Sequence, residues 1–403
     1  MRNLDLYDRI PVVYVFKKEV TMNPFVYGEQ VSGENFCNRQ DEIKELVSEI
    51  SSGQNIMIYS PRRFGKTSLI GEVLGKVRAD GILCVYIDLF PVISERDFVS
   101  ISLKSISRIF SRDSKNILKR VRSFFKRLSP SLYVTVSEDG TPSVGINFSK
   151  TEALPAIEEI FNGLYQFSQD KKKKALVVFD EFQQIGELED TRVEKVLRGI
   201  VQNHREISYV FMGSKKHLIY DMFNNPERPF FKSTAHFPLK KIDREIFADF
   251  VRGKFLQSKR KINLETSLYI VDTAESHPYY TQMLAHTVWE ITGDSQEVTA
   301  VHVDAAVEKI LGREAAAFTN LWDNLTLKQK RLLLALALKK DEEKIFSTQF
   351  LDAYGLGSSS TVQRGIKSLL NKGTIDREGE SVEINDIFLK TWLVRRMRSP
   401  IDH

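Results

Sequence analysis

Apolar runs of strand length alternate with amphipathic stretches of helical length through the first 240 residues of the chain. Five mainly apolar runs are strand candidates, and the run at 175–179 is continuously apolar, as expected for a strand that is buried on both faces of a parallel sheet. The five runs span residues 55–59, 82–88, 175–179, 208–212 and 235–239. Because strands and helices alternate along the chain, the pattern predicts an α/β fold with a parallel sheet.

Two smaller elements are also predicted in this region. Asn38 is a suitable helix N-cap, and Asp41 and Glu42 suit a first helical turn, where exposed backbone N–H groups favour negative charge. Further along, residues 132–136 and 144–148 alternate in polarity on either side of an Asp-Gly turn. This predicts a β-hairpin at about 131–149, as an insertion on the core sheet.

Residues 240–320 have helical periodicity throughout. One apolar stripe contains Ile246, Phe247, Phe250 and Val251. A later helix opens at His277-Pro278, and proline is tolerated there because N–H groups in the first turn have no intrahelical partner. We expect this region to form a helical domain.

The last eighty residues have the order of a winged helix. Thr326 and Gln329 have capping-box spacing ahead of a leucine-rich helix, and a second helix turns Val362 and Ile366 inward. Segments 373–375 and 382–384 then flank a turn and predict a short wing. Gln363, Arg364 and Lys367 would face outward, where they could contact DNA or a protein, and the sequence favours neither.

These patterns divide the chain into four parts. They are an N-terminal extension (1–21), an α/β domain (22–239), a helical domain (240–320) that the resemblance described below identifies as a lid, and a winged-helix domain (321–403). Residues 1–21 fit poorly with the rest of the chain, and Met22 is a more familiar start. An upstream start codon would explain the extension.

Composition excludes several classes of protein. The 403 residues are 42% hydrophobic and 28% charged, which is typical of globular multidomain proteins. No apolar run approaches the ~20 residues that cross a membrane, and no secretory signal is present. Cys37 and Cys84 are too few for a disulfide framework or a cysteine-based zinc site. We therefore expect a cytoplasmic protein without membrane contact.

Positive charge permits nucleic-acid binding without requiring it. The net charge is +5, and residues 104–127 form a basic stretch interleaved with apolar residues. We interpret this stretch as a surface helix with a solvated basic side, in preference to a face for nucleic acid or an acidic partner.

The segment from Ile56 to Leu69 predicts a strand, a tight loop and a helix start. Its Gly65-Lys66-Thr67 core is typical of a phosphate-binding loop, in which backbone N–H groups and the helix N-terminus surround nucleotide phosphates. Lys66 would reach the β- and γ-phosphates, and the Thr67 hydroxyl would ligate Mg²⁺. Ser60 stands where the full pattern has glycine.

The apolar run 175–179 ends in the carboxylates Asp180 and Glu181. Ligand groups lie at the carboxyl ends of parallel strands, so Asp180 lies where a Mg²⁺-holding carboxylate is needed. Glu181 lies one residue further, where a base could activate water. The alternative is a buried strand with a solvated acidic end, which the presence of the loop disfavours.

Four motifs together resemble the archaeal-type ATPase family, a group in the STAND branch of P-loop NTPases that is similar to AAA+ proteins. The motifs are the loop 60–68, Asp180-Glu181-Phe182, Met212-Gly213-Ser214 and His277-Pro278-Tyr279. The resemblance extends from about Met22 to the C-terminus. It implies an α/β P-loop NTPase fold of the ASCE/AAA+ type, a helical lid, a C-terminal winged helix, and ATP and Mg²⁺ as cofactors.

The resemblance also implies roles for individual residues. Ser214 would be the polar sensor near the γ-phosphate, and Pro278 of the lid would pack near the adenine. Arg39 and its neighbours Pro24, Phe25 and Phe36 would border the adenine. The loop residues that would hold the nucleotide are Ser60, Pro61, Arg62, Arg63, Phe64, Gly65, Lys66, Thr67 and Ser68.

The resemblance assigns no arginine finger. Arg228 and Arg244 are candidates, and Lys215 and Lys216 stand where some relatives carry arginine. Nucleotide binding is therefore expected, whereas the rate of hydrolysis stays open.

The leading interpretation is an ATP-driven molecular switch that hydrolyses ATP slowly and couples nucleotide state to the winged helix. One alternative is a DNA-binding replication or transposition factor that uses ATP for assembly, and another is a signalling scaffold that binds a protein. A metabolic kinase is disfavoured because no acceptor pocket is apparent. ATP is preferred over GTP because no Asn-Lys-x-Asp pattern occurs at a strand end, and a homo-oligomer is compatible with the sequence.

Overall fold

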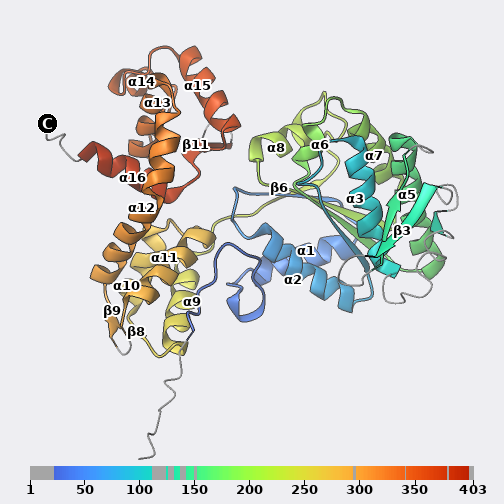
Figure 1. The fold of residues 1–403 in the computed structure, drawn as a ribbon, viewed down its shortest axis with the longest axis horizontal. Helices are drawn as coiled ribbons and strands as arrows, with labels where there is room; N and C mark the ends of the chain where they lie inside the picture. The colour runs from blue at the N-terminus through green and yellow to red at the C-terminus, as the bar shows by residue number, and fades with distance from the viewer. Residues whose placement is uncertain are drawn as a thin grey trace, which may run out of the picture.

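The computed structural model describes residues 22–110, 124–125, 131–136, 142–148, 152–293, 296–340, 342–378 and 381–398. Figure 1 shows an α/β unit beside a column of helices that holds the lid and the winged helix. The predicted N-terminal extension lies outside the described residues.

A five-stranded parallel sheet forms the centre of the α/β unit, as predicted. Its order is β2-β5-β6-β1-β7, and every neighbouring pair is parallel. The strands are β1 (Ile56–Tyr59), β2 (Leu83–Asp88), β5 (Ala175–Asp180), β6 (Ile207–Gly213) and β7 (Ala235–Pro238). β1, β5 and β6 are buried along their whole length, which explains their mainly apolar sequence.

Helices cover both faces of this sheet. One buried cluster lies under α1 (Gln40–Ser51) and α2 (Lys66–Ala79), and the opposite one lies under α3 (Glu95–Ser107), α5 (Ala153–Lys171) and α7 (Arg192–Asn203). The remaining short helices of this unit are η1 (Gly33–Asn35), η2 (Arg108–Phe110), α6 (Gln183–Gly186) and α8 (Lys216–Asn224).

The predicted hairpin is present as the antiparallel pair β3 (Leu132–Val136) and β4 (Pro142–Ile146), which packs beside α3. Its predicted turn at 138–140 lies outside the described residues. So does most of the basic stretch that begins at Lys104.

The predicted N-cap of α1 is wrong. The helix begins at Gln40, so Arg39 holds the cap position, and no side chain caps the helix. Asn38 and Arg39 both have left-handed backbone, with φ of 55° and 75°. Asparagine tolerates that conformation more readily than most residues, so Asn38 serves the turn that precedes the cap.

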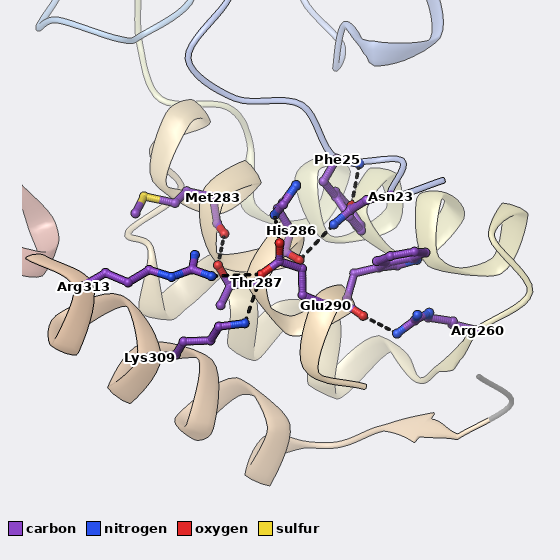
Figure 2. Close-up of polar contacts among 10 residues, drawn as sticks. Asn23, Phe25, Arg260, Met283, His286, Thr287, Glu290, Lys309 and Arg313 are labelled. Carbon is purple, nitrogen blue, oxygen red and sulfur yellow. Dashed lines mark hydrogen bonds and ion pairs between the residues drawn. The ribbon is translucent and has the colours of Figure 1, made fainter. Parts of the chain in front are cut away.

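The lid is helical with one small parallel strand pair. Its elements are α9 (Arg244–Gln257), β8 (Lys261–Ile262), α10 (Leu264–Thr273), α11 (Pro278–Ile291), β9 (Glu297–Val298) and α12 (Ala300–Asp323). His277 is the N-cap of α11 and Pro278 lies in its first turn, as expected. Figure 2 shows Glu290 of α11 holding Lys309 and Arg313 of α12, at 3.1 and 3.2 Å.

The winged helix comes directly after α12. It contains α13 (Leu327–Leu338), α14 (Thr348–Ala353), α15 (Ser359–Asn371), β10 (Ile375–Glu378), β11 (Ser381–Ile384) and α16 (Ile387–Arg398). Thr326 and Gln329 form the predicted capping box, and β10 pairs with β11 in an antiparallel wing. The wing packs against α8 of the α/β unit.

The lid and the winged helix share one hydrophobic core. A single buried cluster joins lid residues such as Val288 and Ile310 to winged-helix residues such as Ile366 and Leu393. α12 runs without a break across the predicted junction at 320–321. We refer to residues 240–398 as the lid–winged-helix unit. None of the helices in the described ranges is both long and apolar enough to span a membrane.

An N-terminal strap, residues 22–37, connects this unit to the α/β unit. The Asn23 side chain donates to the carbonyl of His286 on α11 at 3.1 Å (Figure 2), and the Phe25 ring packs on Phe255 of the lid. At the other end, the Val31 N–H donates to Ser68 Oγ on α2 at 3.1 Å. The strap therefore contacts both units within about fifteen residues.

Candidate nucleotide-binding site

A cavity of about 550 Å³ lies between the α/β unit, the lid and the strap. The phosphate-loop end contains residues 62–68 with Asp180, Glu181 and Ser214, and the opposite end contains strap and lid residues. The site is therefore assembled from segments that are far apart in sequence. Its volume suits a nucleotide-sized ligand.

The phosphate loop connects β1 to α2. Gly65 is the N-cap of α2 with φ of 86°, a left-handed conformation that glycine adopts without steric cost. The N–H groups of the first helical turn therefore point toward the cavity, where they and the helix dipole favour an anion. This is the backbone arrangement that the sequence predicted.

Lys66 is buried beneath the loop, with 7% of its surface exposed. Its Nζ donates to the Ser60 carbonyl at 3.0 Å, to Ser60 Oγ at 3.2 Å and to the Pro61 carbonyl at 3.0 Å. Burial lowers the pKa of Lys66 to about 8, against the opposing effect of the Glu181 and Asp180 charges. Ser60, which replaces the glycine of the full motif, supplies two of these three oxygens, and its Oγ is one that glycine would lack.

Thr67 and Asp180 face each other at the phosphate end. Thr67 Oγ1 donates to Asp180 Oδ2 at 3.3 Å, and the Glu181 N–H donates to Asp180 Oδ1 at 2.9 Å. The Tyr86 hydroxyl donates to the same Oδ2. Burial raises the pKa of Asp180, and the hydrogen bond from Tyr86 opposes that rise.

This pair of oxygen donors fits Mg²⁺. The ion prefers hard oxygen ligands, and in nucleotide sites it usually takes one or two from protein and the rest from water and phosphate. Within the described ranges, no group of three His, Cys, Asp or Glu residues could hold a metal. The donor set therefore suits a metal that arrives with a nucleotide better than a permanently caged ion.

Glu181 is held in position by two side chains. Its Oε2 accepts a hydrogen bond from Ser214 Oγ at 2.8 Å and another from Gln183 Nε2. Its backbone has a φ of 53°, which is uncommon for glutamate. The structure thus brings together Glu181 and Ser214, which lie 33 residues apart. Sequence analysis missed Gln183, although it lies only two residues beyond Glu181.

The end of the cavity opposite the phosphate loop, which we call the base end, contains several residues that the sequence did not predict. Tyr27 of the strap and Tyr279 of the lid meet edge to face, with ring centroids 5.7 Å apart. The Arg63 guanidinium lies 4.2 Å from the Tyr279 centroid. Further lid residues that line this end are Ile242, Phe247 and Gln282. An apolar, aromatic slot of this kind suits a planar base. The adjacent tyrosines after His277-Pro278 were the available signal.

Only some of the residues that were predicted to contact the nucleotide line the cavity. Phe36, Arg39 and Pro278 line the cavity, as do loop residues 62–68. Pro24 and Phe25 do not belong to its lining, and Phe25 is instead part of the lid core. Ser60 is fully buried under the loop, and Pro61 borders a second cavity.

The basic residues considered for the role of an arginine finger have positions outside the nucleotide cavity. Arg228 pairs with the buried Glu194 at 3.0 Å, and Arg244 pairs with Asp272 on the lid. Lys215 pairs with Glu187, and Lys216 borders the second cavity. Burial raises the pKa of Glu194 to about 7, although Arg228 opposes that rise. These four basic residues do not line the nucleotide cavity.

The second cavity, of about 310 Å³, joins the loop to the wing. Phe64 contacts His277 with ring centroids 4.6 Å apart, and His277 contacts Tyr280 at the same distance. Tyr280 in turn meets Phe388 of α16 at 5.7 Å. A continuous series of rings therefore runs from the phosphate loop through the lid to the winged helix.

Comparisons with known proteins agree with this geometry. A model of the family described as "ATPase domain predominantly from Archaea" matches residues 36–284, and one described as "Probable winged helix domain" matches residues 316–395. The first match covers more than half of the chain, so the chain belongs to this family of archaeal ATPase domains. No curated protein matches the sequence.

Solved structures share the fold at low sequence identity. A Walker-type ATPase of Pyrococcus abyssi superimposes with a TM-score of 0.63 and 15% identity, covering 92% of this chain and 99% of that one. The ORC2 protein of Aeropyrum pernix, solved with ADPNP and ADP, gives 0.53 and 14%, covering 95% and 99%. The fold is therefore a parallel-sheet P-loop NTPase with a C-terminal winged helix, as the sequence predicted.

Proposed function

We propose that the protein is an ATP-binding, Mg²⁺-dependent ATPase that acts as a STAND-like switch. In this proposal, the state of the nucleotide sets the position of the lid–winged-helix unit. The observation that carries it is the composition of one cavity. Lys66, the Thr67–Asp180 pair and the Glu181–Ser214 pair meet at one end, and the lid closes the other.

We assign phosphate binding to the loop and its lysine. The backbone N–H groups around Gly65 would bind phosphate oxygens, and the Lys66 ammonium group would exchange its loop oxygens for the β- and γ-phosphates. Thr67 and Asp180 would hold Mg²⁺, which neutralises phosphate charge when it is bound. Positioning and electrostatics then account for most of the catalysis.

We assign the attacking water to Glu181. Both of its described hydrogen bonds go to Oε2, so Oε1 is the atom we assign to the water. Ser214 would both fix this carboxylate and sense the γ-phosphate. Because none of the four candidate basic residues lines the cavity, we expect slow turnover.

We assign the coupling to the ring series that joins Phe64, His277, Tyr280 and Phe388. The lid contributes Pro278 and Tyr279 to the cavity, so loss of the γ-phosphate would change the contacts of α11. The shared core would carry that change to the winged helix.

The exposed polar side of α15 in the winged helix makes DNA binding a second candidate function. Gln363, Arg364 and Lys367 are on one side of α15, while Val362 and Ile366 are buried on the other. Such a face could contact base edges or phosphates. A protein partner would use the same face, and turnover measured with and without DNA separates the two.

The test measures ATP turnover by the purified chain with and without duplex DNA, for wild type and Glu181→Gln. We expect slow turnover that is lost in Glu181→Gln while ATP binding is retained. Glu189→Gln is the matched control because Glu189 is an exposed glutamate nearby. Full turnover by Glu181→Gln would remove Glu181 from its role, and absence of ATP binding would overturn the proposal.

The DNA arm discriminates between the two candidates. Stimulation by duplex, with an affinity that falls steeply as salt increases, would favour an ATPase that acts on nucleic acid. Turnover that is indifferent to DNA, with tight ATP retention, would favour a switch that responds to a protein.

A further inference from the structure

We propose that Tyr86 is a positioning residue for the magnesium site, because its hydroxyl fixes the carboxylate of Asp180 toward Thr67. This inference rests on the proposed function, since it concerns the Mg²⁺ that would accompany ATP. It adds a residue that none of the phosphate-loop or acidic motifs contains.

The sheet places Tyr86 beside the acidic strand end. Tyr86 lies on β2, and in the parallel pairing with β5 it is the partner of Val178. Residues two apart on a strand share a face, so Tyr86, Val178 and Asp180 belong to the same side of the sheet. That side is covered by α2, the helix that begins at Lys66 and Thr67.

The carboxylate of Asp180 is held at both oxygens. Tyr86 and Thr67 donate to Oδ2, and the Glu181 N–H donates to Oδ1. The three donors come from β2, from the start of α2 and from the end of β5. Together they fix the rotation of the carboxylate about its Cβ–Cγ bond, which determines where its lone pairs point.

The tyrosine hydroxyl stabilises the Asp180 carboxylate because that carboxylate is buried. Asp180 is only 7% exposed, and a buried carboxylate needs hydrogen bonds to offset the loss of hydration. A neutral tyrosine hydroxyl supplies one without adding a charge that would compete with a metal ion. Lysine or arginine at the same place would repel Mg²⁺, whereas phenylalanine would leave Oδ2 one donor short.

We expect loss of the Tyr86 hydroxyl to change the affinity for Mg²⁺ and not the affinity for nucleotide in the absence of metal. Residues that orient the ligands of a metal typically change metal affinity by about 10- to 100-fold when they are altered. Tyr86 is not part of the lining of the nucleotide cavity. Removal of its hydroxyl should therefore weaken the contribution of Mg²⁺ to ATP binding, while binding without metal stays the same.

The experiment titrates a fluorescent ATP analogue onto the full chain, first with EDTA and then over a series of Mg²⁺ concentrations. It compares wild type, Tyr86→Phe and Tyr209→Phe. Tyr209 is the matched control because it is a buried tyrosine of β6, in the same sheet, whose hydroxyl pairs with His204 Nδ1 at 2.8 Å. Each of the two substitutions removes one hydroxyl group and keeps the aromatic ring.

We expect the three proteins to bind equally in EDTA. We also expect Tyr86→Phe alone to need about 10-fold more Mg²⁺ for half of the metal-dependent gain in affinity. A second arm adds Tyr86→Phe to Asp180→Ala, where the tyrosine should have no further effect because its acceptor oxygen is gone. This arm is read relative to Asp180→Ala and so does not depend on the stability of Tyr86→Phe alone.

Identical Mg²⁺ titrations for Tyr86→Phe and Tyr209→Phe would overturn the inference. So would an equal loss caused by Tyr86→Phe in the Asp180→Ala background, because that would indicate packing alone. If wild type binds ATP with no gain from Mg²⁺, the proposed function fails first. If wild type gains and Tyr86→Phe matches it, only the role of Tyr86 fails.

Discussion

The two ends of the nucleotide cavity are built in opposite ways. The phosphate end is polar, and each of its main side chains has hydrogen-bond partners within the α/β unit, as Lys66, Asp180 and Glu181 illustrate. The base end is aromatic and is shared between the strap and the lid, where Tyr27 meets Tyr279. One end is therefore fixed by a single domain, whereas the other exists only when two units and the strap come together.

This difference indicates which end of the cavity must be rigid and which end tolerates displacement. Charge stabilisation needs groups that are already oriented, so the phosphate end belongs on the sheet and its loops. An apolar contact tolerates displacement better because it has no strict direction. The base end can therefore lie on the unit that changes position in the proposed switch.

The largest expected effect comes from the phosphate end. Lys66→Ala removes a buried ammonium group, and hydrogen bonds to charged groups contribute about 1.5–3 kcal/mol, so ATP affinity should fall roughly 10- to 100-fold. Equilibrium titration with labelled ATP measures this. Lys76→Ala, in the last turn of the same helix, is the control and should bind as wild type. Unchanged affinity in Lys66→Ala would refute the assignment.

The next effect separates binding from chemistry at the same end. Ser214→Ala removes one of the two side-chain donors to Glu181 Oε2, so the carboxylate loses its fixed orientation. We expect turnover to fall about 10-fold, in the range of a lost hydrogen bond to a charged group, with ATP affinity changing much less. Single-turnover kinetics and equilibrium binding distinguish the two quantities. Equal losses in both would instead make Ser214 a binding residue.

A smaller effect is expected at the base end. Tyr279→Ala removes an aromatic wall worth about 0.5–1.5 kcal/mol, so ATP and ADP affinities should fall by the same factor of roughly 2- to 10-fold. The factor is shared because both nucleotides carry the same base. Tyr269→Ala, on the exposed side of α10, is the control. If Tyr279→Ala weakened ATP but not ADP, this residue would act on the γ-phosphate instead.

The smallest effect tests the junction between the two ends. Burial lowers the pKa of His277 to about 3 from an ordinary value of 6.5, so this histidine is neutral in the folded chain. Its contribution to stability is complete above pH 6.5 and is lost as the pH falls toward 3, because the unfolded chain then binds the proton more readily. Between pH 7 and pH 6 the loss is about 0.7 kcal/mol.

Denaturant unfolding of wild type and His277→Asn at both pH values measures this contribution. Other histidines titrate in the same range, including His204, whose pKa burial lowers to about 4. The informative quantity is therefore the difference between the two proteins. A stability loss of equal size in both would show that His277 does not contribute.

The same contrast explains what the sequence could predict. The loop 60–68 and the acidic pair at 180–181 are short, contiguous motifs at the ends of apolar runs, so local pattern sufficed to place them. The sheet was predictable from the five apolar runs. Hydrophobic periodicity also located the lid and the winged helix, because each helix has its own buried stripe.

The base end could not be predicted in the same way. Pattern shows that Phe25 and Tyr27 are apolar or aromatic, but not that Phe25 enters the lid core while Tyr27, two residues on, faces the cavity. That choice depends on the path of the strap between two units. Tyr86 was missed for a similar reason, since its role depends on which strand lies beside β2.

The continuity of α12 has a mechanical consequence. At 1.5 Å per residue its 24 residues form a lever arm of about 36 Å, rooted beside α11 and ending in the winged helix. Because one core surrounds both ends, the arm cannot bend at the joint without exposing apolar surface. A tilt of about 10° at the base end of the cavity would thus displace the far end of α12 by about 6 Å. In the proposed switch, a small rotation at the nucleotide would therefore become a displacement several times larger at the winged helix.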